Sequence, residues 1–572
     1  MPLFSYQSRP SFLPLPLLLA AGLLFMPDAA TAQATVRRHL VEFRDKVGTP
    51  YTVGQPAQYL SARAIARRQR QQIAVQARDL PPTPAYVQQV RNVPNVAVIY
   101  RTRWFNGVIV ECDSARLAQV QALPFVRSAK TLNRVITNPT RAQRPKKVTD
   151  LQRPLSPNPY GIAFAQADQI DATTMHAAGY RGEGMHVAIF DAGFPGVETI
   201  PAFQPLYQQN RLASTFDVVQ GGTDVYNTHP HGTWVLSTMA AYQPNTYIGT
   251  APNASYHLVR TEDTRGGTET LAEEAYWLIG AEYADSVGVD VINSSLGYTT
   301  FDIPSQSHTY ADLDGNTALA TRAADMCAAV GMLVVNSAGN EGGGPWRHVG
   351  VPADADSILT VGAVDSLGTL AGFSSVGPTA DGRIKPNLVS QGSQSAIIDP
   401  NGAVSRGSGT SFAGPILAGL ATGFWQANPT LTAQQVRRFL ELSGTQATAP
   451  DNFLGYGIPN FRRAYNLANP NAPLSLAPTG PADRSVPELF PNPVPGADFG
   501  LRLPQRLVGQ ELTVKIFDTT GRLLREATVR TPAHSDTVVM PLDGKPVVAA
   551  GIYVCTVRAA SGEQHTLRFV KK

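Results

Sequence analysis

Residues 186–194 read HVAIFDAGF, an apolar run that ends in Asp191 and a glycine. Apolar runs return at residues 289–293 (VDVIN), 332–335 (MLVV) and 358–361 (ILTV), and helical patterns lie at residues 271–286, 317–330 and 433–442. Strands that are apolar on both faces and alternate with helices are typical of a parallel sheet covered by helices on each side. The sequence therefore predicts an α/β fold with a doubly wound parallel sheet over residues 151–466.

The remaining parts of the chain differ from this central region. Residues 1–32 carry one cation before an apolar run and end in small residues, which is typical of a cleaved secretory signal peptide. A membrane anchor would need about 20 apolar residues, and this run is shorter. Residues 33–150 predict a small α+β region with a basic helix at residues 61–76, and the proline-rich stretch at residues 138–159 predicts an exposed connector. Residues 467–486 predict a proline-rich linker, and residues 487–572 predict a small all-β sandwich.

Charge is divided unevenly between these regions. Residues 33–150 hold 20 Lys and Arg against 6 Asp and Glu, whereas residues 151–466 hold 14 against 27. A basic segment of this kind often binds nucleic acid or an acidic membrane. Here an almost equally acidic neighbour lies in the same chain, so we expect the partner to be internal. Attraction between the two regions should contribute to docking, although it is screened beyond about 8 Å at physiological salt.

The three cysteines exclude several kinds of site. Cys112, Cys327 and Cys555 lie far apart and form no paired motif. This spacing rules out a disulfide framework, a zinc ribbon and an iron–sulfur site.

Three local patterns point together to nucleophilic catalysis. Asp191 follows the first apolar run, His231 lies in THPHGTW, and Ser411 lies in GSGTSFAGP at the start of a long apolar helix. Each alone has a plain structural explanation, namely a turn, a core histidine and a helix cap. Together they supply a hydroxyl, a base and a carboxylate that orients the base. Their order in the chain, Asp, His, Ser, differs from that of α/β-hydrolases, so a lipase or esterase is disfavoured.

A fourth pattern supplies an oxyanion donor. The stretch LVVNSAGNEGGG leaves an apolar strand and enters a glycine-rich loop at Asn340. Its side-chain amide can donate to a developing oxyanion, and the nearby glycines let a substrate backbone approach. An asparagine that merely forms a turn is the alternative.

With these motifs, residues 160–466 resemble the subtilisin-like serine proteases. The matching segments are FDAG (190–193), HGT (231–233), NSSLG (293–297) and GTSFAGP (409–415). The resemblance implies that Ser295, Leu296 and Gly297 pair with an extended substrate and line one wall of the S1 pocket. Ala338 and Gly339, beside Asn340, should form the opposite wall. Ala192, Trp234 and Phe412 differ from the residues that are common at these positions in the family. None of them removes a catalytic group, so we expect the protein to be active, and its cleavage specificity stays open.

The flanking regions carry resemblances of their own. Residues 33–150 occupy the place of a subtilisin propeptide, which implies a folding helper and temporary inhibitor. Residues 487–572, with LFPNP at 489–493 and KIFDTTGR at 515–522, resemble the type IX secretion sorting domain of Bacteroidota. That resemblance implies contact with secretion machinery, passage through the inner and outer membranes, and a final place at the cell surface or outside the cell.

The prediction is therefore a secreted serine endopeptidase that cleaves proteins and peptides through an acyl-enzyme. Its chemistry requires no cofactor, no catalytic metal and no nucleic acid. Residues 311–316 (ADLDGN) carry oxygen ligands of the kind that calcium prefers, and they equally fit a helix cap. The alternative function is a catalytically silent surface binding protein on the same scaffold. The sequence leaves cleavage specificity, the natural substrate, the processing sites and the oligomeric state open.

Overall fold

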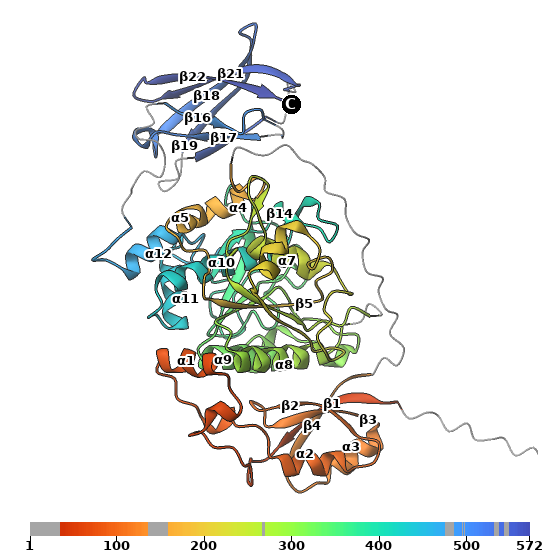
Figure 1. Cartoon of the computed structure of the whole chain (residues 1–572). Coiled ribbons are helices and arrows are strands. Elements are labelled where there is room, and N and C mark those ends of the chain that lie inside the picture. The colour runs from red at the N-terminus through yellow and green to blue at the C-terminus, as the bar shows by residue number, and fades with distance from the viewer. Residues whose placement is uncertain are drawn as a thin grey trace, which may run out of the picture.

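The computed structural model describes residues 35–134, 158–265, 269–474, 486–494, 496, 498–530, 537–542 and 548–572. Three parts follow one another along the chain: a small α+β region, an α/β region and an all-β region (Figure 1). This arrangement confirms the predicted fold class. The predicted signal peptide of residues 1–32 lies outside the described residues, and the proposed domain boundaries remain predictions. Within the described ranges, no helix is long and apolar enough to cross a membrane.

The central region is built on a seven-stranded sheet in which every neighbouring pair is parallel. The strand order is β13-β12-β11-β10-β5-β9-β6. The chain starts at β5, goes to β6 at one edge, comes back to β9 between these two strands, and then crosses to β10 to build toward the other edge. The direction therefore switches between β5 and β10, which is where open α/β sheets place their ligands. The strands are β5 (His186–Asp191), β6 (Leu212–Asp217), β9 (Ser255–Arg260), β10 (Val291–Ser294), β11 (Leu333–Ser337), β12 (Leu359–Val364) and β13 (Leu388–Gln391).

Helices cover both faces of this sheet. A hydrophobic core lies on each face of the sheet, and alternate residues of β5 belong to different cores. Val187 and Ile189 pack in the core on the side of α7 and α10, whereas Ala188 and Phe190 pack in the core on the side of α8 and α9. The two buried faces explain why these strands lack polar alternation. The helices are α4 (Phe164–Gln169), α5 (Ala172–Ala177), α6 (Gln204–Gln208), α7 (His231–Ala240), α8 (Ala272–Val287), α9 (Leu319–Ala329), α10 (Thr410–Ala427), α11 (Ala433–Leu442) and α12 (Phe461–Ala468). Two hairpins complete the region: β7 (Tyr242–Gln243) with β8 (Tyr247–Ile248), and β14 (Ser395–Ile398) with β15 (Val404–Gly407).

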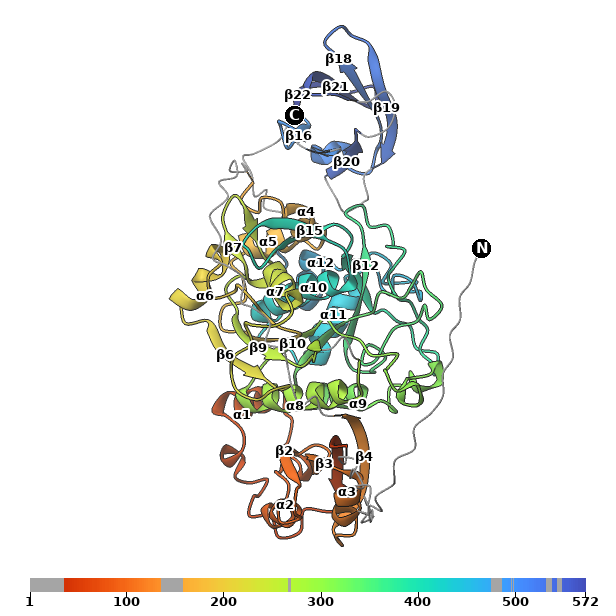
Figure 2. The same cartoon turned by 90° about the vertical axis from the view of Figure 1, so that its right-hand side faces the viewer.

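The N-terminal region is a four-stranded antiparallel sheet in the order β2-β3-β1-β4. One face packs against α2 and α3, and the other face packs against α8 and α9 of the central region (Figures 1 and 2). The second contact buries Leu40, Ile109 and Leu132 together with side chains of those two helices. The elements are β1 (Arg37–Phe43), α1 (Ala62–Arg70), α2 (Pro84–Arg91), β2 (Ala97–Thr102), β3 (Gly107–Cys112), α3 (Ser114–Gln121) and β4 (Val126–Arg134).

The C-terminal region consists of two small antiparallel sheets around a core of its own. The alternation that the sequence shows in this region matches buried and exposed positions, for example along β18. One sheet contains β16 (Glu488–Phe490), β17 (Asp498–Arg502) and β20 (Thr537–Pro541). The other has the order β19-β18-β21-β22 and contains β18 (Glu511–Asp518), β19 (Leu523–Arg530), β21 (Gly551–Ala559) and β22 (Gln564–Lys571).

Candidate active site

The structure joins Asp191 and His231, which are 40 residues apart in the chain. Asp191 is the last residue of β5 and is fully buried, with its Oδ1 accepting the Ala192 N–H at 2.7 Å. His231 is the first residue of α7, and its Nδ1 lies 2.9 and 3.0 Å from the two carboxylate oxygens of Asp191. Because an ionised carboxylate only accepts, Nδ1 carries the proton and Nε2 is left to act as a base.

The environment of His231 sets the direction of its pKa shift. Burial lowers the pKa, but the charge of Asp191 and its hydrogen bond outweigh burial, so the pKa of His231 is raised above the ordinary value of 6.5. Two aromatic rings flank the imidazole. The centroids of the Trp234 and Phe412 rings each lie 6.2 Å from that of His231. The Trp234 indole is itself held by a 2.9 Å hydrogen bond to Asp399.

Ser411 is the second residue of α10, the long apolar helix that the sequence predicts. Gly409 precedes the helix, and Ser411 therefore lies among the N–H groups that have no partner within the first turn. Its hydroxyl donates to the Ser295 carbonyl at 3.4 Å, a long hydrogen bond.

The orientation of the Asn340 amide follows from its neighbour Thr410. The Thr410 N–H donates to Asn340 Oδ1 at 2.9 Å, and the Thr410 hydroxyl lies 3.0 Å from the same oxygen. A backbone N–H can bond only to an acceptor, so these contacts fix which end of the amide is the oxygen. The Asn340 NH₂ group is thereby left available as a donor. Sequence reasoning found Asn340 but missed Thr410, although the two motifs that contain them were both identified.

The five predicted substrate-binding residues lie at the carboxyl ends of β10 and β11. Ser295 follows β10, and its hydroxyl donates to the Ser411 carbonyl at 2.9 Å, which ties this segment to α10. The Leu296 carbonyl accepts from Asn336 of β11 at 3.1 Å. A β-carbon at Gly297 would meet only one atom within 4 Å, so space is left beside that residue.

Ala338 and Gly339 continue from β11 on the other side. Ala338 is fully buried, and its N–H donates to Val361 at 2.9 Å. Gly339 has a φ of +108°, and a β-carbon there would lie 2.6 Å from Glu341 Oε2 and 2.9 Å from Ser375 Oγ. The positive φ therefore favours glycine here, and a β-carbon would also displace the ends of these two side chains.

A hollow of about 490 Å³ adjoins Asn340. Trp346 and Phe373 supply its large apolar surface, and Glu341 its one charged side chain. The other lining residues are Gly343, Gly344, Pro345 and Gly372. Sequence reasoning did not single out these two aromatic residues, because each lies in a loop with no motif of its own.

The carboxylates of the candidate calcium loop accept hydrogen bonds from nearby backbone N–H groups. Asp312 accepts the Thr309 N–H at 2.7 Å, and Asp314 accepts the N–H groups of Asn316 and Thr317 at 2.8 Å each. The expected cap on the next helix is not formed, because α9 starts after Ala318 and has no side-chain cap.

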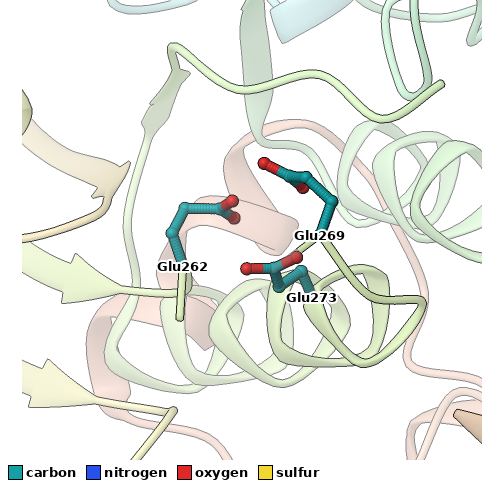
Figure 3. Close-up of side chains that lie close together, drawn as sticks. All are labelled: Glu262, Glu269 and Glu273. Carbon is teal, nitrogen blue, oxygen red and sulfur yellow. The ribbon is translucent and has the colours of Figure 1, made fainter. Parts of the chain in front are cut away.

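A different acidic group gathers at the N-terminus of α8. Carboxylate oxygens of Glu262, Glu269 and Glu273 lie within 4.8 Å of one another (Figure 3). Burial and neighbouring carboxylates raise the pKa of Glu262 to about 8 and that of Glu273 to about 10. The Tyr298 hydroxyl donates to Glu262 at 2.6 Å. Oxygen ligands at this spacing could hold a hard cation such as calcium, and sequence reasoning missed the group because its members are not consecutive.

Comparison with known families agrees with this geometry. Residues 182–457 match the Subtilase family, Peptidase S8, and residues 38–148 match the Peptidase S8 propeptide domain, Bacteroidota. The first match contains Asp191, His231, Asn340 and Ser411. The second match spans the N-terminal sheet except its first residue, Arg37.

Individual relatives are similar to the central region. The chain is 34% identical to Subtilisin DY of Bacillus licheniformis over 312 residues, which cover 54% of this chain and 98% of that protein. It is 33% identical to Subtilisin NAT of Bacillus subtilis subsp. natto over 309 residues, which cover 54% and 71% of the two chains. Bacillopeptidase F of Bacillus subtilis is 28% identical over 411 residues, which cover 66% of this chain and 27% of that protein. The chain therefore belongs to the subtilase family and is a serine-type endopeptidase with an S8 propeptide domain.

Proposed function

We propose that Ser411, His231 and Asp191 form the catalytic triad of a secreted endopeptidase that works through an acyl-enzyme. The observation that best supports this proposal is the pair of contacts from His231 Nδ1 to Asp191, at 2.9 and 3.0 Å. They leave Nε2 unprotonated, as a base must be. The 34% identity to Subtilisin DY over 312 residues supports the same roles.

In the first step, Ser411 Oγ attacks the carbonyl carbon of the scissile peptide bond while His231 Nε2 takes the hydroxyl proton. The buried Asp191 carboxylate stabilises the imidazolium that results. His231 then gives the proton to the leaving amine, the C–N bond breaks, and the acyl group stays on Ser411. Water, activated by His231 in the same way, hydrolyses the ester and restores the serine.

The tetrahedral oxyanion is held by two donors in this proposal. One is the Asn340 NH₂ group, whose orientation is fixed by Thr410. The other is the Ser411 N–H, which lies in the first turn of α10 and so has no helical partner. Fixed donors cost no reorganisation as the charge develops, and such stabilisation is often the largest catalytic contribution.

Protein and peptide substrates bind as an added strand in this proposal. Ser295, Leu296 and Gly297 would pair with the substrate backbone, and Ala338 and Gly339 would form the opposite wall of the S1 pocket. The supporting observation is that the two segments leave the adjacent parallel strands β10 and β11 at the same end of the sheet. Strand addition gives backbone affinity, and the pocket gives side-chain selectivity.

The proposal extends to maturation and export. Residues 33–150 would act as a temporary inhibitor that the enzyme itself cleaves within the connector, and the signal peptide would be removed after Ala32. Residues 487–572 would direct passage across the outer membrane as a type IX sorting domain. Deletion of residues 487–572 should then leave active enzyme inside the cell envelope, whereas unchanged appearance in the medium would contradict this role.

The Ser411→Ala chain tests the catalytic proposal. We expect it to remain unprocessed at full length and to resist a fluorophosphonate probe that labels the wild-type enzyme. A wild-type chain that is folded and processed in trans, yet takes up no probe, would instead support the catalytically silent binding protein. Wild-type labelling that persists in the Ser411→Ala chain would show that another residue is the nucleophile.

A further inference from the structure

The helix α1 buries a face made largely of arginine. Ala64, Arg67, Arg68 and Gln71 are buried at positions i, i+3, i+4 and i+7, the spacing of one helix face. Ser61 caps the helix by accepting the Ala64 N–H. Residues at these positions of a helix are normally apolar. Burying a guanidinium group costs free energy unless hydrogen-bonding and charged partners surround it.

The Arg67 side chain packs at the C-terminal end of α8. Its guanidinium donates to the Val289 carbonyl at 2.6 Å, to the Val330 carbonyl at 3.3 Å and to the Asp285 carboxylate. The side chains of Arg67 and Asp285 are 1% and 0% exposed. The donors are thus matched by a carboxylate and two backbone carbonyls that belong to the central region.

Two further arginines share the same carboxylate. Arg68 donates to Asp285 Oδ2 at 2.7 Å and is braced by Asp79, and Arg103 donates to the same oxygen at 2.6 Å. Burial alone would raise the pKa of Asp285, but Arg103, Arg67 and Arg68 lower it below its ordinary value. Among the described residues, the cations paired with Asp285 all come from the N-terminal region.

Acidic groups continue on both sides of Asp285. The Glu282 carboxylate accepts the Thr102 hydroxyl at 2.5 Å and the Arg103 N–H at 2.9 Å. Asp290 pairs with Arg63 and, at 3.3 Å, with Arg70. We call Glu282, Asp285, Asp290 and the carbonyls of Val289 and Val330 the arginine socket.

The arginine socket is separate from the candidate active site. Asp290 lies just before β10, whereas Ser295 follows that strand. Four strand residues at about 3.3 Å each put roughly 13 Å between those ends. The socket therefore lies toward the amino ends of the strands, and Figures 1 and 2 place α1 beside α8 and α9.

We propose that the mature enzyme keeps the arginine socket as a binding site for an arginine-bearing helix, separate from the active site. This inference rests on the proposed maturation, which would remove α1 and Arg103 and leave the carboxylates facing solvent. The first occupant is residues 56–80 of the chain itself. The ligand class is a helical peptide with arginines three or four residues apart.

The geometry favours arginine over lysine. Arg67 uses three separate nitrogens on three different acceptors. A planar guanidinium presents donors in a fixed fork, whereas an ammonium is a compact point charge that cannot span those acceptors. Shape as well as charge should therefore decide binding.

The test uses mature enzyme prepared by self-processing of the wild-type chain and then inactivated with phenylmethylsulfonyl fluoride to protect the probe. The probe is a fluorescent peptide of residues 56–80, and anisotropy reports its binding. Two variant peptides, Arg67→Gln and Arg70→Gln, have the same length and net charge. Arg70 is the matched control, because its side chain is 34% exposed and its ion pair is long.

We expect saturable binding of the wild-type peptide, at least tenfold weaker binding of the Arg67→Gln peptide, and less than threefold weakening for Arg70→Gln. An Arg67→Lys peptide should also bind at least fivefold more weakly. In active enzyme, the peptide should leave cleavage of a short chromogenic substrate unchanged. No saturable binding, or equal losses for the two glutamine variants, would overturn the proposal.

A second measurement uses the full chain. The delay between self-cleavage and the appearance of peptidase activity should be at least tenfold shorter for the Arg67→Gln chain than for the Arg70→Gln chain. Equal delays would count against the arginine socket. If the Arg67→Gln chain fails to fold, the peptide experiment on wild-type enzyme still decides. Failure of the proposed function would be visible earlier, as a wild-type chain that neither processes itself nor reacts with the serine reagent.

Discussion

Replacing Asn340 by leucine tests the oxyanion proposal at the atom that would perform it. Asn340 Oδ1 is already engaged by the N–H and hydroxyl of Thr410, at 2.9 and 3.0 Å, so only the NH₂ group is left to meet an oxyanion. Leucine has the same number of side-chain heavy atoms in the same branched arrangement and has no donor. Loss of one oxyanion donor typically lowers kcat by about 10²–10³, or about 2.7–4 kcal/mol.

The loss should fall on kcat and leave KM nearly unchanged. A donor aimed at the tetrahedral oxygen acts mainly in the transition state, and an interaction made only there changes kcat. The assay is cleavage of a chromogenic peptide, with active sites counted by a fluorophosphonate. Because a slow enzyme matures slowly, the variant chain is processed in trans by a trace of wild-type enzyme, which is then removed.

Thr410→Val is the matched control for this experiment. Valine keeps the volume and the backbone N–H that holds Asn340 Oδ1, and it removes only the hydroxyl. We expect a loss in kcat below about tenfold, because a typical hydrogen bond contributes about 1 kcal/mol. A kcat for Asn340→Leu within threefold of wild type, or a loss carried by KM, would refute the assigned role.

Two further predictions concern protonation. Since Asp191 raises the pKa of His231, kcat/KM should fall as the pH drops through a value above 6.5. The Asp191→Asn variant should have a lower His231 pKa and a kcat about 10⁴ times lower than wild type. An unchanged midpoint in the pH profile of the variant would contradict this prediction. Glu262 has a pKa of about 8 in the folded chain and an ordinary value of 4.5 in the unfolded chain. Between these two pH values the folded chain keeps a proton that the unfolded chain has lost. In metal-free buffer the free energy of unfolding should therefore decrease as the pH rises from 4.5 to 8. Glu262→Gln should therefore raise Tm relative to wild type more at pH 8 than at pH 5, and equal differences in thermal unfolding would exclude this role for Glu262.

Local patterns in the sequence predicted most of the fold. Apolar strands such as residues 186–190 and helices such as residues 433–442 follow from periodicity, because a two-faced buried strand and an amphipathic helix each leave a short-range signature. The predicted helix at residues 61–76 is shorter in the structure, where α1 ends at Arg70. Gln72 has a φ of +58°, which the helical pattern did not reveal.

The predicted site residues were identifiable because each lies in a short motif with its own chemistry. Asp191, His231, Asn340 and Ser411 each lie near the end of a strand or the start of a helix, and the order of the motifs in the chain disfavoured a lipase or esterase. Motifs of this kind identify residue types and spacing. They do not give the distances between side chains.

Only the tertiary structure decided the contacts between distant segments. The Asn340 amide is oriented by Thr410, 70 residues later in the chain, and Asp285 pairs with three arginines of the N-terminal region. The total charges of the two regions predicted attraction but could not say which carboxylate would be buried. Hydrogen-bond direction and burial depend on neighbours that folding brings together, so the sequence determined the chemical groups and the fold determined their partners.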